Sequence, residues 1–312
     1  MEERSWDLII IGAGPAGLTA GIYSARSGLD TLILEKGMPG GCINDASIIE
    51  NYPGFPNGIG GQDLASKMKE QCENTGAEIR IPENVIDIEL KDKKKLVTTE
   101  KELYSCDSLI IATGTEHRKL GIPSEEKFMG RGISYCAVCD GPLFKDKELI
   151  VVGGGNCAAI DALYLLNLAS SIMLIHRRES LRAEKALVED MKRNGIEILF
   201  NTEVKEFRGD DRLRSVIIYN NKIGDFSEME VDGAFIEIGR IPNTEIVKRL
   251  GVNLTDGYII VDQRQRTNIE GVYAAGDVTT SPHRQIGKAV GDAIVAATEA
   301  YGYIKRPYYY NK

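Results

Sequence analysis

Near its start the chain reads Leu8-Ile9-Ile10-Ile11-Gly12-Ala13-Gly14-Pro15-Ala16-Gly17. The apolar run predicts a buried strand, and the pattern after the glycines predicts a helix to about Ser27. A second apolar strand, residues 31–34, ends in Glu35. Gly-x-Gly-x-x-Gly in this context is typical of a dinucleotide-binding βαβ unit, in which the backbone approaches a pyrophosphate and an acid accepts hydrogen bonds from a ribose. The alternative is an ordinary tight turn between a strand and a helix.

A second copy of this unit lies in the middle of the chain. A predicted strand at residues 149–152 is followed by Gly153-Gly154-Gly155-Asn156-Cys157-Ala158, a helix through Leu168 and a strand at residues 172–175. The glycine loop reads Gly-x-Gly-x-x-Ala, which is a variant of the same fingerprint. The chain is therefore predicted to contain two dinucleotide-binding units.

The two copies differ at the position that contacts the ribose. His176 stands where the first copy has Glu35, and Arg177 and Arg178 follow it directly. Guanidinium groups can clamp a 2′-phosphate that a carboxylate would repel. We therefore expect NADPH in the second unit and an adenosine cofactor without a 2′-phosphate in the first. The alternative for these arginines and Arg182 is the solvated, cationic start of a helix.

A pair of cysteines separates the two units in sequence, in Cys136-Ala137-Val138-Cys139-Asp140. Two thiols at this spacing can close and open a small disulfide ring, and the adjacent acid is placed to move a proton. Half of a zinc site is an alternative, but zinc needs four ligands and the remaining cysteines form no second pair. A static disulfide is another, although so short a loop removes little unfolded-state entropy. The redox interpretation is favoured.

Composition limits the class of protein. With 312 residues and 43% hydrophobic content, two domains are a better expectation than one. The net charge of −8 argues against nucleic acid or an anionic membrane as a partner. The acidic start, the glycine-broken apolar run and the lack of a long uncharged stretch predict a soluble, cytoplasmic protein. The basic run from Lys91 to Lys95, broken by Asp92, is predicted to form a solvated hairpin turn.

A later stretch supports a flavin in the first unit. Residues 269–277 predict a strand that enters a Gly276-Asp277 turn, where Asp277 is suited to the hydroxyls of a ribityl chain. A flavin can take a hydride from a nicotinamide and pass electrons to a disulfide. Because this turn comes long after the first glycine loop, the flavin domain must be discontinuous in sequence.

Together these motifs resemble the low-molecular-weight thioredoxin reductases, which are FAD- and NADPH-dependent pyridine nucleotide-disulfide oxidoreductases. The resemblance rests on residues 12–17, Ala112-Thr113-Gly114, residues 136–141, residues 153–158, residues 176–178 with Arg182, Gly276-Asp277 and Arg284-Gln285. It implies an α/β fold with two Rossmann-like domains, the NADPH domain inserted into a discontinuous FAD domain. The implied bounds are 1–115 and 246–312 for the FAD domain and 116–245 for the NADPH domain with the dithiol. Ala112-Thr113-Gly114 and Gly239-Arg240 would mark the two crossings.

The resemblance also implies which residues contact the cofactors. They are Gly12, Gly14, Pro15, Ala16, Gly17, Glu35, Gly41, Cys42, Asn51, Ala112, Thr113, Gly114, Gly153, Gly155, Asn156, Cys157, Ala158, His176, Arg177, Arg178, Arg182, Gly239, Gly276, Asp277, Arg284 and Gln285. No metal is expected.

The chain departs from the family pattern at two cysteines. Cys42 replaces a usual Gln, and is either a third thiol near the flavin or, as we favour, a small neutral substitute. Cys157 replaces a usual Ser or Thr and is expected to be a small residue at the helix start, where the helix dipole could lower its pKa. Cys72 is in helical register with Leu64 and Met68, and it and Cys106 are expected in the core.

The resemblance implies a thioredoxin-disulfide reductase that acts as a homodimer. Hydride would pass from NADPH to FAD, and electrons then to the Cys136–Cys139 disulfide. Cys139 would meet the flavin, Cys136 would attack the disulfide of thioredoxin, and Asp140 would act as acid–base if burial raises its pKa. The inserted domain would swivel about hinges near residues 115–120 and 238–243.

Other functions remain open at this point. One alternative is a related flavin enzyme that is fed by ferredoxin or passes electrons to oxygen, although such relatives lack the second glycine loop or the arginine pair. Another is a glutaredoxin-like or peroxidase-linked disulfide protein as the acceptor. An alternative from a different class is a non-catalytic redox sensor that contains the dithiol.

Overall fold

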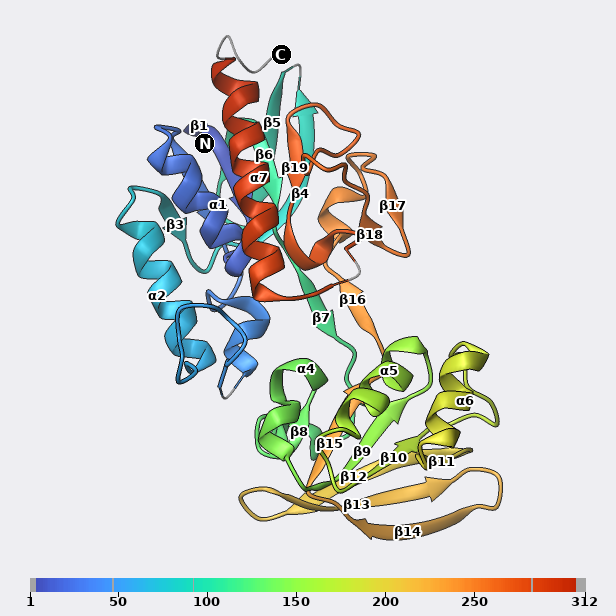
Figure 1. Ribbon diagram of the computed structural model, residues 1–312. Helices are drawn as coiled ribbons and strands as arrows, with labels where there is room; N and C mark the ends of the chain where they lie inside the picture. The colour runs from blue at the N-terminus through green and yellow to red at the C-terminus, as the bar shows by residue number, and fades with distance from the viewer. Residues whose placement is uncertain (1–3, 47, 92, 282, 307–312) are drawn as a thin grey trace. The chain divides into compact units, whose positions relative to one another are not determined.

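The computed structural model describes residues 4–46, 48–91, 93–281 and 283–306, in two compact units. Unit 1 comprises residues 1–44, 52–116 and 241–312, and unit 2 comprises residues 45–51 and 117–240. Unit 2 is thus formed almost entirely by one insertion into unit 1. The paired strands β7 (Thr115–His117) and β16 (Arg240–Pro242) lie where the chain passes from one unit to the other (Figure 1).

A mixed sheet forms the centre of unit 1. Its strands, in the order β3-β2-β1-β6-β5-β4 with β19 beside β6, are β1 (Arg4–Ile11), β2 (Thr31–Leu34), β3 (Glu78–Arg80), β4 (Val85–Lys91), β5 (Lys94–Thr99), β6 (Leu103–Ile111) and β19 (Val272–Ala274). Strands β3, β2, β1, β6 and β19 are parallel, while β4 and β5 join antiparallel to β6. Because β1 is central, Leu8, Ile9, Ile10 and Ile11 are buried on both of its faces.

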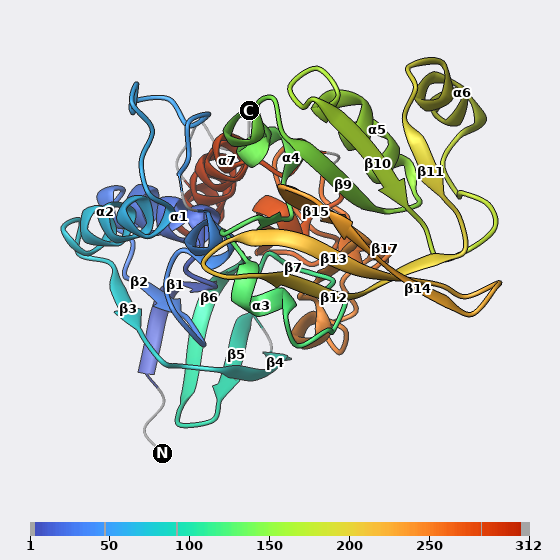
Figure 2. The same ribbon diagram turned by 90° about the horizontal axis from the view of Figure 1, so that it is seen from below.

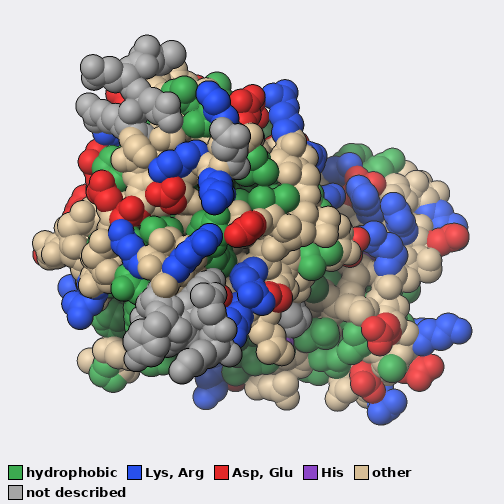
Figure 3. Space-filling model, turned by 90° about the horizontal axis from the view of Figure 1, so that it is seen from above, with side chains coloured by type: hydrophobic (Ala, Val, Ile, Leu, Met, Phe, Trp, Pro, Cys, Tyr) green, Lys and Arg blue, Asp and Glu red, His purple; other side chains and the backbone are tan. Residues whose placement is uncertain are grey.

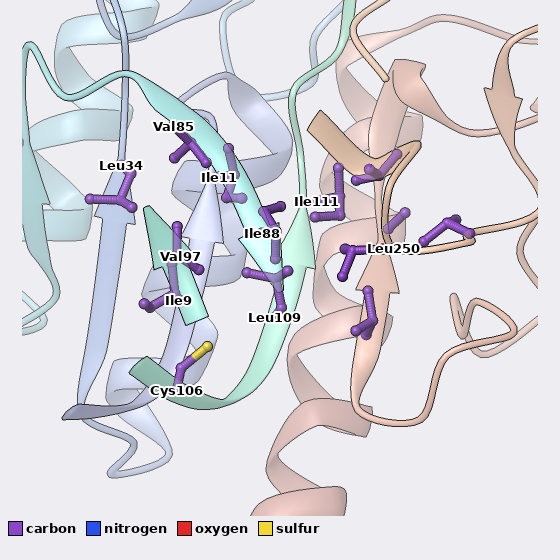
Figure 4. Packing of buried hydrophobic residues seen from close by; sticks show 14 of the residues in the cluster. Ile9, Ile11, Leu34, Val85, Ile88, Val97, Cys106, Leu109, Ile111 and Leu250 are labelled. Atoms are coloured by element: carbon purple, nitrogen blue, oxygen red, sulfur yellow. The ribbon is translucent and has the colours of Figure 1, made fainter. Parts of the chain in front are cut away.

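Different elements pack on the two faces of this sheet. Helices α1 (Pro15–Arg26) and α7 (Ile286–Lys305) pack together on one face, with α2 (Gly61–Glu73) beside α1. On the other face Ile9 and Ile11 pack with residues of β4, β5 and β6, and with Leu250 from the segment 245–261 (Figure 4). That segment contains η3 (Glu245–Val247), β17 (Leu254–Thr255) and β18 (Tyr258–Ile259). Successive side chains of β1 therefore point into the cores on opposite faces of the sheet, as expected for a strand.

Unit 2 is built on a parallel sheet of order β11-β10-β9-β15-β8. The strands are β8 (Ile133–Ser134), β9 (Glu148–Gly153), β10 (Ser171–Ile175), β11 (Glu197–Leu199) and β15 (Gly233–Glu237). Helices α5 (Asn156–Leu165) and α6 (Lys185–Arg193) pack on one face, and the antiparallel strands β12 (Thr202–Gly209), β13 (Leu213–Asn220) and β14 (Asp225–Glu230) lie on the other (Figure 2). Short helices α3 (Glu125–Phe128), α4 (Ala137–Asp140), η1 (Gly41–Asp45), η2 (Gly141–Phe144) and η4 (Gly276–Val278) complete the described elements.

Both predicted βαβ units are present. Strand β1, helix α1 and strand β2 match the first, and β9, α5 and β10 match the second. The α/β fold class is confirmed. Helix α5 is shorter than predicted: it ends at Leu165, because the N–H of Leu168 bonds to the Leu165 carbonyl at 2.9 Å and tightens the last turn.

The basic run around residue 93 differs from its prediction. Strands β4 and β5 form the expected hairpin, although Asp92 lies outside the described residues. Lys95 is not solvated, however, and is only 3% exposed. Its Nζ donates to the Asp107 carbonyl at 2.8 Å and lies 5.0 Å from the centre of the Tyr303 ring, and burial lowers its pKa.

The surface carries both signs of charge. Figure 3 shows Lys and Arg side chains interspersed with Asp and Glu on the face it presents, with no wide basic area. No helix among the described residues has the length and apolarity needed to cross a bilayer. The acidic lead, Met1 to Glu3, lies outside the described residues.

The cysteines allow a direct test of this packing. Cys72 and Cys106 are fully buried, as predicted, and burial raises the pKa of each thiol to about 12, whereas Cys42 and Cys157 are exposed. At pH 8 the buried thiols should be thiolate in only about one molecule in ten thousand. We expect maleimide to label Cys42 and Cys157 in the folded protein, and Cys72 and Cys106 only after unfolding in urea. Mass spectrometry of digested protein measures this, and equally fast labelling of Cys72 in the folded chain would contradict the packing.

Candidate active site

The first glycine loop is packed too tightly for a side chain at Gly12 or Gly17. A Cβ at Gly12 would lie 2.4 Å from the carbonyl oxygen of Ala112, and a Cβ at Gly17 would lie 1.8 Å from the carbonyl oxygen of Gly12. Gly12 also has φ +103°, a conformation that glycine adopts without strain. The loop therefore brings α1 against the carboxyl ends of β1 and β6, with Pro15 in the first turn of the helix.

Glu35 reaches this loop from the end of β2. Its carboxylate accepts hydrogen bonds from the backbone N–H of Ala13 at 2.7 Å and of Gly37 at 2.8 Å. The acid and the glycine loop, which the sequence predicted to act on one ligand, thus lie in direct contact.

The loop at residues 40–42 lies against the same turn. The N–H of Gly40 donates to the Ala13 carbonyl at 2.8 Å, and a Cβ at Gly41 would lie 3.7 Å from Cα of Gly14. Cys42 is exposed, and its thiol donates to the Thr115 carbonyl at 3.1 Å. Cys42 therefore lies next to Thr115, and the residue before it approaches the first glycine loop.

The remaining predicted residues of unit 1 gather at the same edge. Thr113 donates its hydroxyl to the Asn243 carbonyl at 2.7 Å, and Asn243 donates its N–H to the Gly114 carbonyl at 3.1 Å. A Cβ at Gly276 would lie 3.0 Å from Cβ of Ala16, so the turn with Asp277 meets the first turn of α1.

Three other residues predicted for this site are placed differently. Gln285 is the residue that precedes α7, and Arg284 stacks on Tyr258 with 4.5 Å between its guanidinium carbon and the ring centre. The Nε atom of Arg284 is buried and has no hydrogen-bond partner among the described residues. Asn51 is not brought to this edge within unit 1: it is exposed and belongs to residues 45–51, which group with unit 2.

The second glycine loop repeats the tight approach in unit 2. A Cβ at Gly153 would lie 2.4 Å from the carbonyl oxygen of Glu237 and 2.6 Å from Cβ of Ala158. Gly155 precedes α5, and a Cβ there would meet nothing within 4 Å. The exposed residue Cys157 lies in the first turn of α5, as expected. Open space at the N-terminus of a helix is suited to an anion.

His176 lies beneath this loop. Its Nδ1 is 2.9 Å from the Gly153 carbonyl oxygen, and a Cβ at Gly154 would lie 2.2 Å from the imidazole ring. Burial lowers the pKa of His176, so the ring is neutral at physiological pH. His176 therefore supports the loop by packing.

The arginines after His176 are exposed beside the loop. The backbone N–H of Arg182 donates to the Gly154 carbonyl at 2.7 Å, while Arg177 and Arg178 precede it in an irregular segment. The alternative that they open a helix is wrong, because α6 begins only at Lys185. Their charge is therefore presented by a loop next to the glycines.

The cysteine pair forms a disulfide at the carboxyl end of β8. Cys136 precedes the short helix α4, and its sulfur accepts a hydrogen bond from the N–H of Cys139 at 3.3 Å. Both residues are half-buried.

Asp140 follows Cys139 directly and is half-buried. Its Oδ2 accepts a hydrogen bond from the Ser134 hydroxyl at 2.7 Å, and its Oδ1 is buried with no partner among the described residues. Burial raises the pKa of Asp140, in spite of the hydrogen bond from Ser134, which lowers it. The carboxyl group is therefore easier to protonate than an exposed aspartate.

The sheet order of unit 2 aligns these features along one edge. The carboxyl ends of β8, β15, β9 and β10 carry, in that order, the disulfide, Glu237, the glycine loop and His176 with the arginines. Ligands of open parallel sheets bind at this edge. A dinucleotide whose phosphates lie at the glycine loop would thus extend toward the arginines on one side and toward the disulfide on the other.

Sequence reasoning missed an acid pair on this edge. Glu237 on β15 and Asp161 on α5 are hydrogen-bonded through their side chains. Burial, and then the charge of Asp161, raises the pKa of Glu237 to about 8, while Arg240 opposes the shift. No local signal could have found this pair, because only the fold brings the two positions together; the one hint is an acid at the end of an apolar strand.

Comparisons with known proteins agree with this geometry. The model of the family "Pyridine nucleotide-disulphide oxidoreductase" matches residues 6–300. The chain is 44% identical to the thioredoxin reductase of Listeria innocua serovar 6a over 97% of this chain and 95% of that protein. It is 42% identical to the solved thioredoxin reductase of Streptococcus pyogenes MGAS5005, with a TM-score of 0.93 over 98% of this chain and 100% of the other. The thioredoxin reductase of Lactococcus lactis, solved in the FR conformation, is 43% identical, with a TM-score of 0.66 over 97% and 100%.

The acid pair predicts a pH-dependent stability. Between the ordinary pKa of a glutamate and about 8, the folded chain holds a proton on Glu237 that the unfolded chain has lost. The free energy of unfolding should therefore fall as pH rises through this window, and Glu237→Gln should reduce that fall. Urea unfolding between about pH 5 and pH 8 measures it. Glu197→Gln, at an exposed position of β11 in the same sheet, is the control, and parallel curves for wild type and both variants would contradict the assignment.

Proposed function

The chain belongs to the pyridine nucleotide-disulphide oxidoreductase family, and we propose that it acts as a thioredoxin reductase. It transfers electrons from NADPH through FAD and the Cys136–Cys139 dithiol to the disulfide of thioredoxin. The observation that carries this proposal is the disulfide itself, which lies on the same sheet edge as a dinucleotide-binding loop and beside a carboxyl group of raised pKa.

FAD is assigned to unit 1. Gly14 leaves the backbone bare for the pyrophosphate, while Gly12 and Gly17 allow the tight turn and the close helix packing. Glu35 accepts hydrogen bonds from the adenosine ribose, and Asp277 holds the ribityl hydroxyls. Two features support this assignment: the cradle at the start of α1, and the buried Nε of Arg284, which lacks a partner in the described part of the chain. When bound, the flavin accepts a hydride from a nicotinamide and supplies two electrons to a disulfide.

NADPH is assigned to unit 2. The N-terminus of α5 receives the pyrophosphate, with Gly155 and Asn156 at its start. Asn156 is held in place by Glu184, since its Nδ2 donates to Glu184 Oε1 at 2.9 Å and its Oδ1 accepts the Glu184 N–H at 2.9 Å. Arg177, Arg178 and Arg182 bind the 2′-phosphate.

Cys139, Cys136 and Asp140 have different roles in the proposed reaction. Cys139 is the thiol that faces the electron donor, and Cys136 attacks the disulfide of thioredoxin through a mixed disulfide. Asp140, in its protonated form, gives its proton to the thiolate that leaves, and Ser134 fixes the carboxyl group in position.

Three further assignments extend the proposal. The FAD domain comprises residues 1–115 and 246–312 and the NADPH domain residues 116–245. The NADPH domain reorients about hinges near residues 115–120 and 238–243, which contain β7 and β16. The protein acts as a homodimer in the cytoplasm.

The dithiol role is tested with Cys139→Ser. NADPH should still bleach the visible absorbance of the flavin, because hydride transfer to the flavin does not involve the thiols, but reduction of thioredoxin should fall by more than about a hundredfold. An NADPH-oxidation assay with thioredoxin measures it. Cys106→Ala, which removes a thiol from the core of unit 1, is the control and should retain activity. Full thioredoxin reduction by Cys139→Ser would disprove the role.

The phosphate clamp is tested by replacing Arg177 and Arg178 with Ala. Loss of charged hydrogen bonds to the 2′-phosphate should raise the KM for NADPH by about tenfold to a hundredfold, with little change in the KM for NADH. Arg193→Ala is a matched control, because Arg193 is an exposed arginine of unit 2 that pairs with Asp190 on α6. An equal loss for both nucleotides would rule out the clamp.

A further inference from the structure

In unit 2 a buried carboxylate is hydrogen-bonded to the residue that precedes the dithiol. Glu125 is only 1% exposed, and its carboxylate accepts three hydrogen bonds. The N–H groups of Leu120 and Gly121 donate at 2.9 Å and 3.0 Å, and the Tyr135 hydroxyl donates at 2.7 Å. Burying a carboxylate is costly unless such bonds compensate it, so the arrangement constrains all its partners.

Tyr135 connects Glu125 to the segment that contains the cysteines. It is 8% exposed, packs in the core between the sheet and strands β12 and β13, and is the residue immediately before Cys136. The imidazole of His117 lies 4.8 Å from its ring. The side chain of Tyr135 therefore ties the backbone at Cys136 to the turn at Leu120 and Gly121.

The local structure around Cys136 supplies few other restraints. Strand β8 has only two residues; it pairs with β15 at Ala234 and Phe235, and Ile133 also bridges to Met129. Beyond it, the N–H of Cys136 donates to the Ser134 hydroxyl at 3.0 Å, which is a bond within the same segment. The bond from Tyr135 to Glu125 thus adds a side-chain contact between this segment and the turn at Leu120 and Gly121.

We propose that Glu125 and Tyr135 are positioning residues that hold Cys136 against Cys139 and so favour closure of the disulfide ring. Two thiols held in the bonding geometry have a high effective concentration, which stabilises the disulfide relative to the dithiol. A loosened Cys136 lowers that concentration and makes the disulfide easier to reduce. The inference rests on the proposed function only in taking this pair to be the redox-active one.

The test is the thiol–disulfide equilibrium of the full chain in glutathione buffers, read by alkylation and mass spectrometry. Tyr135→Phe keeps the ring in the core and removes only the hydroxyl. We expect it to lower the equilibrium constant for ring closure about tenfold, which corresponds to a shift of about 30 mV toward easier reduction. Glu125→Gln should shift the equilibrium in the same direction. The double variant should shift it no further than the larger single change, because both changes break one link.

The pH dependence provides a second readout. Burial, followed by the bond to Glu125, raises the pKa of Tyr135, and burial, followed by the charge of Arg240, lowers the pKa of His117 to about 3. Neither ring therefore titrates near neutrality. The difference between wild type and Tyr135→Phe should be the same at about pH 6 and pH 8.

Tyr104→Phe is the matched control. Tyr104 is a fully buried tyrosine of unit 1 whose hydroxyl accepts a hydrogen bond from Arg80 Nη1 at 2.6 Å. Its replacement should lower stability without changing the dithiol equilibrium. The proposal is overturned if Tyr135→Phe leaves the equilibrium within twofold of wild type, if Tyr104→Phe shifts it equally, or if the effects of the two unit 2 changes add. Because the measurement needs neither NADPH nor thioredoxin, its failure is distinguishable from failure of the proposed function.

Discussion

The close approach of a bare glycine backbone to a neighbouring strand is the constraint on which both units depend. In unit 1 it is Gly12 against the Ala112 carbonyl, and in unit 2 it is Gly153 against the Glu237 carbonyl. Each approach brings the N-terminus of a helix to the carboxyl edge of a parallel sheet, where backbone N–H groups favour an anion. A side chain at Gly12 would clash with the Ala112 carbonyl, and one at Gly153 would clash with the Glu237 carbonyl and with Ala158 of α5. The rest of the proposed chemistry follows from these two points of contact.

The two units share one βαβ arrangement and differ in the side chains at the ends of corresponding strands. The end of β2 carries Glu35, whose carboxylate turns back to the glycine loop, whereas the end of β10 carries His176 and exposed arginines. An acid selects a ribose and excludes a phosphate, while guanidinium groups do the reverse. In unit 2 the sheet order then adds β15 and β8 beyond the glycine loop, and the disulfide follows β8 directly. The order of strands thus sets the order of chemical groups along the edge.

Local features of the sequence predicted much of this structure. The glycine loops, the strands that flank them and the core positions of Cys72 and Cys106 are confirmed, because each depends on short-range pattern or on burial of one element. Burial also raises the pKa of Asp140, which is the condition for its expected role. The sequence did not predict the burial of Lys95, the acid pair of Asp161 with Glu237, or the link from Glu125 to Tyr135. These depend on side chains that meet only after distant elements pack. From the sequence alone, a lysine or glutamate is expected at the surface unless a partner for its charge is known.

We propose that one chain holds a flavin and a dithiol that exchange electrons. Anaerobic reductive titration of the purified holoprotein, followed by visible absorbance, tests this most directly. Because flavin and disulfide each take two electrons, wild type should consume about two two-electron equivalents per chain before the titration is complete. Consumption of about one equivalent, with Cys136 and Cys139 still joined when the flavin is fully bleached, would contradict the account.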